Sequence, residues 1–347
     1  MNASSVPWKI QLQDTVNLAT QWPNILHVSL SVVILTFGLV TNIINTIIFS
    51  RLGIKTSSNL TFLALSLTDV LNLSAGLVYS ICGNFALAQL TDLVTDPITI
   101  IYILSVTPRA AFSRVTCCIT VFITLERCLC IASPLKVKSL LTTTKTLIIL
   151  ISIFVICTFI VYIHVYTGAV YLTNRFEYSA NTSRFGLALN DNYNYINLVS
   201  GAINSIFFVA LFFVIVIATL FLTFQLAKKT KWRKSLATYG DSKLDVLTKR
   251  DKSISKITAL LAIILIITYL PFLILCVFAI LKINFVAYGN NNGFNQILWM
   301  VSNIVEHINS SSSLFVYYTM SSLYRKTFHS MFHSFHRHNK SVSKLNC

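Results

Sequence analysis

Charged residues are scarce in this chain. Only 11% of its 347 residues are Asp, Glu, Lys or Arg, whereas 55% are apolar. A soluble domain of this size carries roughly 25% charged residues, so the composition excludes a surface that faces water throughout. The apolar residues gather in long runs, each sufficient to cross a hydrocarbon core of about 30 Å. These runs predict seven spans, near residues 25–50, 59–82, 97–130, 145–167, 196–226, 257–281 and 295–319.

Several patterns that particular chemistries require are also missing. No lysine lies in the expected seventh span, which excludes a retinal Schiff base and therefore a light-driven pump or an opsin. The eight cysteines do not suggest a disulfide framework, because several fall in apolar spans, where cysteine acts as a small hydrophobe. No nucleophile–base pair, metal-ligand cluster or phosphate-binding loop is apparent in the sequence. We therefore expect that the protein is not an enzyme, and we assign no catalytic residue.

Positive charge is abundant but unevenly distributed. The chain carries 27 Lys and Arg against 11 Asp and Glu, and 21 of the 27 cations fall in segments 51–58, 127–145, 227–256 and 325–344. These alternate with segments that carry few cations, so the positive-inside rule places the N-terminus outside and the C-terminus in the cytoplasm. The net charge of +16 thus indicates membrane topology and no nucleic-acid partner. The basic loop 227–256 is equally compatible with attraction to anionic membrane lipid and with docking of an acidic partner.

This topology divides the chain into an extracellular N-terminal tail (1–24), a seven-helix bundle (25–319) and a cytoplasmic amphipathic helix with a tail (320–347). The glycosylation acceptors Asn2 and Asn181 fall in segments assigned to the outside. The last part carries an apolar stripe at helical spacing, formed by Tyr324, Phe328, Met331, Phe332 and Phe335. Such a stripe on a basic helix is typical of a helix that lies on the inner leaflet. The expected fold is an all-α membrane protein, a seven-transmembrane helix bundle with a short amphipathic eighth helix.

Ionisable residues inside a span are costly and usually face the bundle interior, so each is a functional candidate. Arg109 and Arg127 are eighteen residues apart, five helical turns, and should share one face of the third helix. Glu306 and Tyr317 are eleven residues apart, about three turns, and should share one face of the seventh. Two polar levels joined by rigid helices are what a transmembrane signal relay requires. Arg114 lies about 140° around the helix from Arg109 and receives no role.

Five short motifs follow one another along the chain. They are Gly38–Asn42, Asn59–Asp69, Glu126-Arg127-Cys128, Thr268-Tyr-Leu-Pro271 and Asn309–Tyr317, and the last is followed by Leu323–Phe328. They resemble the signatures of the rhodopsin-like G-protein-coupled receptor family on its first, second, third, sixth and seventh helices and on its eighth helix. The departures are a tyrosine in place of the sixth-helix tryptophan and Ser313-Leu314 in place of Asn-Pro. These departures favour a divergent lineage, most like the invertebrate chemosensory or neuropeptide-type receptors.

The resemblance implies roles at the cytoplasmic end and the middle of the bundle. Arg127 should pair with Glu126 and Asp251 in an ionic lock that opens when a G protein is activated, and Pro271 and Tyr317 should act as activation switches. Asp69 should anchor a polar cluster, either around a sodium ion or as a protonated, hydrogen-bonded acid. The cluster is expected to comprise Asn42, Asp69, Thr116, Asn309, Ser310 and Ser313.

Arg109 occupies the position where amine receptors of this family carry an aspartate. The reversed charge argues against a monoamine and favours a ligand with an anionic group, whereas neutralisation by Glu306 is the alternative. The expected pocket residues are Arg109, Ser113, Tyr171, Tyr269, Glu306 and His307. The resemblance implies a plasma-membrane receptor for a peptide or small molecule, with a heterotrimeric G protein and arrestin as cytoplasmic partners. The rival interpretations are a seven-span transporter or channel, against which we see no internal repeat, and a degenerate receptor that signals weakly.

Overall fold

The computed structural model describes residues 7–81, 102–132, 141–168, 171–177, 182–188, 193–235, 242–281 and 293–331. Side chains are described for 26–81, 104–132, 141–162, 199, 201–228, 252–278, 280–281 and 297–331. The predicted sites Asn2 and Asn181 lie outside the described residues, and the side chains of Tyr171 and Asp251 lie outside the described side chains.

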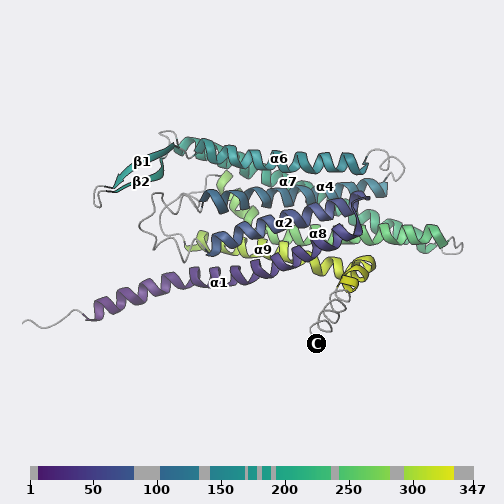
Figure 1. Cartoon of the computed structure of the whole chain (residues 1–347), viewed down its shortest axis with the longest axis horizontal. Helices are drawn as coiled ribbons and strands as arrows, with labels where there is room; N and C mark the ends of the chain where they lie inside the picture. The colour runs from purple at the N-terminus through teal and green to yellow at the C-terminus, as the bar shows by residue number, and fades with distance from the viewer. Residues whose placement is uncertain are drawn as a thin grey trace, which may run out of the picture.

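Seven long helices form the bundle (Figure 1). They are α1 (Pro7–Leu52), α2 (Ser57–Ile81), α4 (Thr107–Ala132), α6 (Thr143–Gly168), α7 (Tyr193–Ser235), α8 (Ser242–Ile280) and α9 (Gly293–Met320). A π-helical turn, η2 (Tyr102–Val106), leads into α4, and a short helix, 322–331, follows α9. The predicted seven-helix membrane bundle is confirmed. One difference is at the start, where α1 begins at Pro7 and so extends into the segment assigned to the N-terminal tail.

Within the described residues, six of these seven helices are long and apolar enough to cross a membrane. The candidate spans are Leu26–Leu52, Ser57–Ile81, Leu104–Ala132, Thr143–Tyr162, Gly201–Lys228 and Lys252–Phe278. The seventh helix, α9, is less apolar because it carries two asparagines, a glutamate, a histidine and four consecutive serines within a few turns. It nevertheless packs along α1 and α8 and reaches α2, so its polar side chains lie against other helices.

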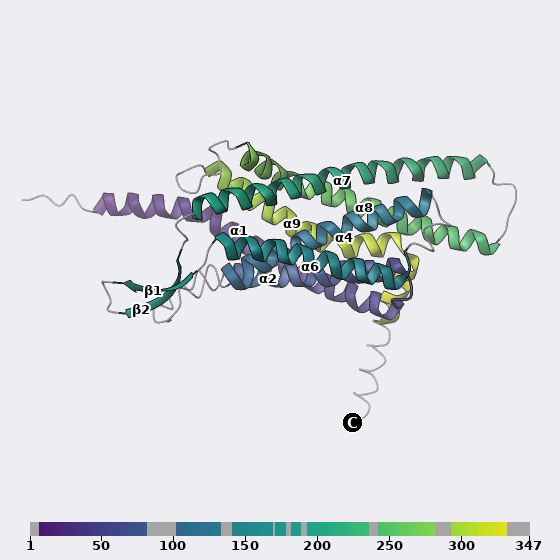
Figure 2. The same cartoon turned by 90° about the horizontal axis from the view of Figure 1, so that it is seen from above.

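The helix α4 is the centre of the bundle. It contacts α2, α6, α7 and α8, whereas α1 packs on α2 and α9, and α8 packs on α7 and α9 (Figure 2). Large apolar side chains of α6 and α7 point outward, and buried polar side chains such as those of Asn42, Asp69 and Thr124 lie between helices. This inside-out distribution is expected for a helix bundle whose outer surface meets lipid.

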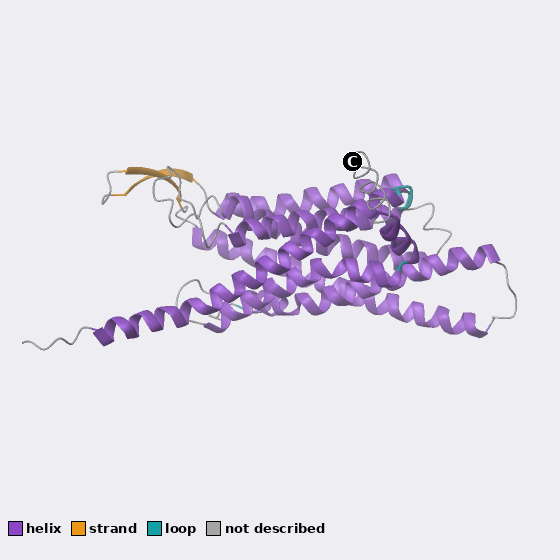
Figure 3. Ribbon diagram, turned by 60° about the horizontal axis from the view of Figure 1, so that its bottom comes forward, coloured by secondary structure: helices purple, strands orange, loops and turns teal. Residues whose placement is uncertain are grey.

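The two ends of the bundle differ. At one end a two-stranded antiparallel hairpin, β1 (Tyr171–Glu177) and β2 (Thr182–Ala188), follows α6, and the start of α1 projects in the same direction (Figures 1 and 3). At the other end α7 and α8 extend beyond their neighbours, and helix 322–331 turns away from α9. We call these the hairpin end and the C-terminal end. The hairpin was not predicted from the sequence.

Candidate functional site

An ion pair joins α4 to α9 near the hairpin end. Arg109 Nη2 lies 2.9 Å from Glu306 Oε2 and also donates to Asn303 Oδ1 at 2.6 Å. The two charged side chains are only 11% and 15% exposed. The pairing considered from the sequence is therefore present, and Asn303 is a partner that sequence reasoning missed. Among the described residues, Arg109 Nε, Glu306 Oε1 and Asn303 Nδ2 are buried without a hydrogen-bond partner.

This ion pair forms one wall of a cavity of about 160 Å³, which we call the α4–α8–α9 cavity. Its lining comprises Val106, Arg109, Ala110, Ser113, Arg114, Phe208, Thr268, Tyr269, Phe272, Trp299, Ser302, Asn303 and Glu306. The Ser113 and Tyr269 hydroxyls are 3.1 Å apart, and the Tyr269 ring stacks on Phe208 with centroids 5.6 Å apart. Four of the six predicted pocket residues, Arg109, Ser113, Tyr269 and Glu306, therefore meet here.

The other two predicted pocket residues are not part of this lining. His307 is 4% exposed, but it follows Glu306 on α9 and does not line the cavity. Its side chain is packed within the bundle, and its role in ligand binding stays a prediction. Tyr171 is the first residue of β1, and its side chain is outside the described part of the chain.

A polar cluster surrounds Asp69 in the middle of the bundle. Thr116 and Ser310 donate their hydroxyls to Asp69 Oδ1 at 3.0 and 3.1 Å. Asn42 Nδ2 donates to the Ser310 carbonyl at 2.7 Å, which links α1 to α9. The predicted cluster is therefore assembled, except that the Asn309 side chain makes no hydrogen bond to it among the described residues. The four side chains come from α1, α2, α4 and α9, so the cluster holds four helices in register.

The cluster continues toward the C-terminal end through a residue that sequence reasoning missed. Ser313 donates to Asn42 Oδ1 at 3.2 Å, and Asn45 Nδ2 donates to Ser313 Oγ at 3.0 Å. The Tyr324 hydroxyl then donates to Asn45 Oδ1. Burial raises the pKa of this phenol, so it remains a donor. We call the whole chain of contacts, from Asp69 to Tyr324, the polar ladder; Ser313, which departs from the family motif, is one of its rungs.

The Glu126–Arg127 pair lies at the C-terminal end of α4. Arg127 Nη2 is 2.8 Å from Glu126 Oε1, and both side chains are nearly fully buried, at 6% and 2% exposed. Ser57 of α2 donates to the same Glu126 oxygen at 2.7 Å, and its hydroxyl is 2.9 Å from that of Thr146 on α6. The pair predicted from the sequence is present, and Ser57 and Thr146 join it to two neighbouring helices. Its predicted third member, Asp251, lies on α8 outside the described side chains.

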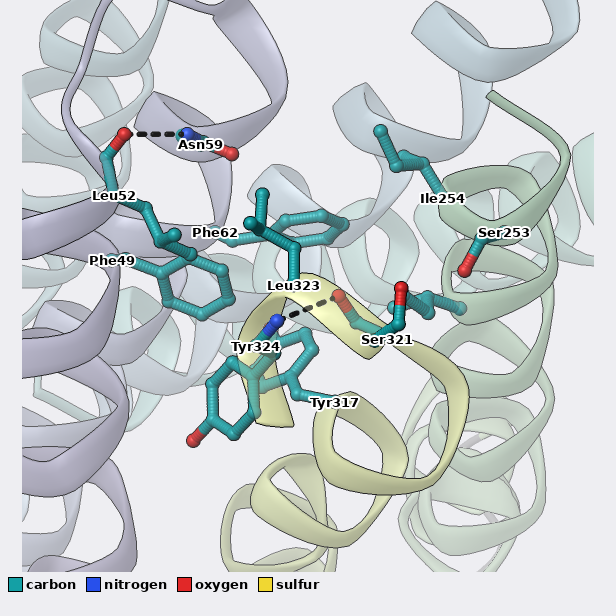
Figure 4. Close-up of a pocket in the computed structure, with 12 residues that line it drawn as sticks. Phe49, Leu52, Asn59, Phe62, Ser253, Ile254, Tyr317, Ser321, Leu323 and Tyr324 are labelled. Carbon is teal, nitrogen blue, oxygen red and sulfur yellow. Dashed lines mark hydrogen bonds between the residues drawn. The ribbon is translucent and has the colours of Figure 1, made fainter. Parts of the chain in front are cut away.

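Tyr317 belongs to an aromatic cluster beside the ladder. Its ring is 4.9 Å from that of Phe49, 5.2 Å from Phe62 and 5.7 Å from Tyr324, measured between centroids. The Tyr317 hydroxyl is buried without a hydrogen-bond partner among the described residues. The cluster borders a second cavity, of about 450 Å³, between the ends of α1, α2, α8 and the turn after α9 (Figure 4). Figure 4 shows Ser253, Ser321 and Asn59 around this space.

The other predicted switch, Pro271, lies inside α8 two residues after Tyr269.

The fold and these sites define a multi-pass helical membrane protein with a polar cavity near one end and a buried Glu-Arg pair near the other. Residues 29–335 match the model of the serpentine-type 7TM GPCR chemoreceptor family Srw. Because the match extends from within α1 to beyond α9, the chain belongs to this family of serpentine seven-transmembrane chemoreceptors. It is a family of receptors and not of enzymes, and it implies an extracellular ligand and a G protein as partners. No curated protein matches the chain.

Proposed function

We propose that the chain is a rhodopsin-like chemoreceptor that binds its ligand in the α4–α8–α9 cavity and activates a heterotrimeric G protein at the C-terminal end. The observation that carries this proposal is the separation of two polar sites on the single helix α4. Arg109 faces the cavity, and Arg127 lies eighteen residues further along the same helix. A rigid helix that contacts four others can transmit a change at one level to the other.

The hairpin end faces the outside in this proposal, and the basic C-terminal end faces the cytoplasm. A ligand in the cavity touches Tyr269, whose hydroxyl meets Ser113 of α4. Tyr269 is two residues before Pro271, where the missing backbone N–H weakens α8 and allows it to bend. Movement of the part of α8 between Pro271 and the C-terminal end of the bundle then uncovers Arg127 and the second cavity for the G protein. We retain the Arg127–Asp251 lock as part of this mechanism.

Three further partners belong to the proposal. Arrestin is expected to use the same C-terminal opening after activation. Membrane lipid is expected along the basic segment 227–256 and helix 322–331, where cations meet an anionic leaflet. A sodium ion at Asp69 would be held by carboxylate and hydroxyl oxygens, which suit a hard cation. Thr116 and Ser310 already point their hydroxyls at Asp69 Oδ1, so the site has oxygen ligands in place.

The proposal is tested by ligand-independent G-protein activation in cells. Wild type, Asp251→Ala and Arg127→Ala are compared at matched surface expression, with Arg51→Ala, a cation at the exposed end of α1, as the control. We expect Asp251→Ala to raise basal activity severalfold, Arg127→Ala to abolish it and the control to match wild type. Basal activity that is absent in all variants for every G-protein class would contradict the proposal and would favour a degenerate receptor or a transporter or channel.

A further inference from the structure

The α4–α8–α9 cavity contains a second guanidinium that the ion pair does not account for. Arg114 lies in its lining, one turn further along α4 than Arg109 and Ala110. Its Nη1 donates only to the carbonyl of Ala110 on its own helix, at 2.8 Å. Its Nε is buried and has no hydrogen-bond partner, and no carboxylate lies within ion-pair distance of it among the described residues.

The charges that line the cavity do not balance. Two guanidinium groups, from Arg109 and Arg114, face one carboxylate, that of Glu306. Glu306 is already bonded to Arg109, and Asn303 accepts a second hydrogen bond from the same nitrogen. One positive charge is therefore left over beside the ion pair. A buried charge without a partner is strongly unfavourable, so such residues are retained in membrane proteins for binding or transport.

We propose that Arg114, rather than Arg109, is the anchor for the ligand, and that the ligand is a small monocarboxylate. The inference rests on the proposed function of the cavity and specifies the class of ligand it takes. A carboxylate matches the fork of donors on a guanidinium and accepts two parallel hydrogen bonds from it. Arg109 is less available for this role because its counter-charge is built into α9.

The rest of the lining limits the size and character of the ligand. A volume of about 160 Å³ is below the roughly 300–1,000 Å³ of pockets for drug-sized molecules, so the bound group must be short. Phe208, Phe272 and Trp299 supply an apolar wall for its carbon chain. Glu306 Oε1 and Asn303 Nδ2, both buried without partners among the described residues, can take a hydroxyl substituent on the acid.

This assignment explains the arrangement around Tyr269. A carboxylate held by Arg114 lies next to Ser113, the neighbouring residue on α4, whose hydroxyl is 3.1 Å from that of Tyr269. An anion there competes for the Ser113 and Tyr269 hydroxyl protons, because a carboxylate is the stronger acceptor. Binding therefore changes the contact between α4 and α8 two residues before Pro271, on the side of Pro271 nearer the C-terminal end.

The test measures thermal unfolding of the purified full-length protein in lipid-supplemented detergent, which requires no G protein. The probes are short straight-chain and 2-hydroxy monocarboxylates, their primary amides, the matching amines, and sodium chloride at equal ionic strength. A ligand that binds the native state raises the apparent Tm in proportion to the logarithm of its concentration above Kd. We expect at least one acid to raise the Tm of wild type, and the amides, amines and chloride to leave it unchanged.

The variants test whether Arg114 anchors the acid. Arg114→Met should weaken the apparent affinity for the acid by about 10- to 100-fold, the size expected for lost hydrogen bonds to a charged group. Arg114→Lys should retain part of the affinity, and Arg51→Met, far from the cavity, should retain all of it. The proposal is overturned if no acid stabilises the protein, if amides or chloride stabilise it as well as acids do, or if Arg114→Met keeps the affinity.

The two proposals fail in different ways. A receptor that shows the expected basal signalling but no acid-dependent rise in Tm keeps the proposed function and loses the carboxylate assignment. A protein that binds acids through Arg114 but activates no G protein keeps the binding site and loses the signalling role.

Discussion

The polar ladder and the α4–α8–α9 cavity are both polar and both buried, yet they differ in how completely their polar atoms are hydrogen-bonded. In the ladder, Asn42, Ser313, Asn45 and Tyr324 bond to one another across three helices. In the cavity, two arginines, a glutamate and an asparagine leave four buried atoms without partners among the described residues. Satisfied polar groups fix the packing of helices, whereas unsatisfied ones destabilise the resting protein and are kept where something else binds. The difference separates scaffold from site without reference to any family.

The largest effect is expected from breaking the ladder at Asn42. Its amide donates to Gly38 O and Ser310 O, and its oxygen accepts from Ser313 and Asn45. Asn42→Leu removes all four contacts, including both that join α1 to α9 at this level, at about 0.5–1.5 kcal/mol for each lost hydrogen bond. We expect surface expression to fall to a small fraction of wild type, measured by flow cytometry of an epitope-tagged chain. The control Thr36→Val, on an exposed face of α1, should express normally, and normal expression of Asn42→Leu would contradict the role of the ladder.

A smaller effect is expected from the cavity ion pair. Glu306→Gln leaves Arg109 without its counter-charge. Removing one partner of a fully buried pair costs about 3–5 kcal/mol, and partial exposure of both side chains reduces the loss of stability to roughly 2 kcal/mol. The apparent Tm of the purified protein measures it. The double variant Arg109→Met/Glu306→Met should recover most of the loss, because an apolar pair replaces an ion pair at little net cost. A double variant less stable than Glu306→Gln would show that the pair itself stabilises the bundle.

The smallest effect is expected at the last rung of the ladder. Tyr324→Phe keeps the ring in its aromatic cluster and removes only the hydrogen bond to Asn45. The expected loss is about 1 kcal/mol, or roughly 2–4 °C in apparent Tm. Tyr318→Phe is the matched control, since its hydroxyl meets the exposed His329 and its removal should change Tm by less. Equal shifts in the two variants would show that burial of the hydroxyl is unimportant.

Much of this arrangement was predictable from the sequence. The second and fourth spans were expected to begin near residues 59 and 145, and their helices begin at Ser57 and Thr143. Apolar run length is a local property, so it locates helices well. Asp69, Thr116 and Ser310 were likewise expected to meet, because the family resemblance implies a cluster there and a buried carboxylate requires hydrogen-bond partners.

The contacts that were missed depend on how helices rotate against one another. Asn45 and Ser313 are separated by 268 residues, and no motif indicated that they face each other. Helical phase was the available signal, since Asn45 lies one turn from Asn42 and Asn303 one turn from Glu306. The hairpin β1–β2 was not predicted because the length of apolar runs, which locates the spans, carries no signal for short strands in a loop. The position of Arg114 in the cavity could not be derived from the sequence. Arg114 and Arg109 are about 140° apart around α4, but both side chains are long enough to reach the same cavity.

The central claim, that the ladder is scaffold and the cavity is site, is tested most directly by one comparison of apparent Tm without ligand. Tyr324→Phe removes a satisfied buried contact, and Arg114→Met removes an unsatisfied buried charge while keeping the volume of its stem. The account predicts opposite signs: Tyr324→Phe lowers the Tm, and Arg114→Met raises it by a few degrees, since each 1 kcal/mol corresponds to roughly 2–4 °C. If Arg114→Met lowers the Tm instead, the guanidinium stabilises the resting fold, and the distinction between the two regions does not hold.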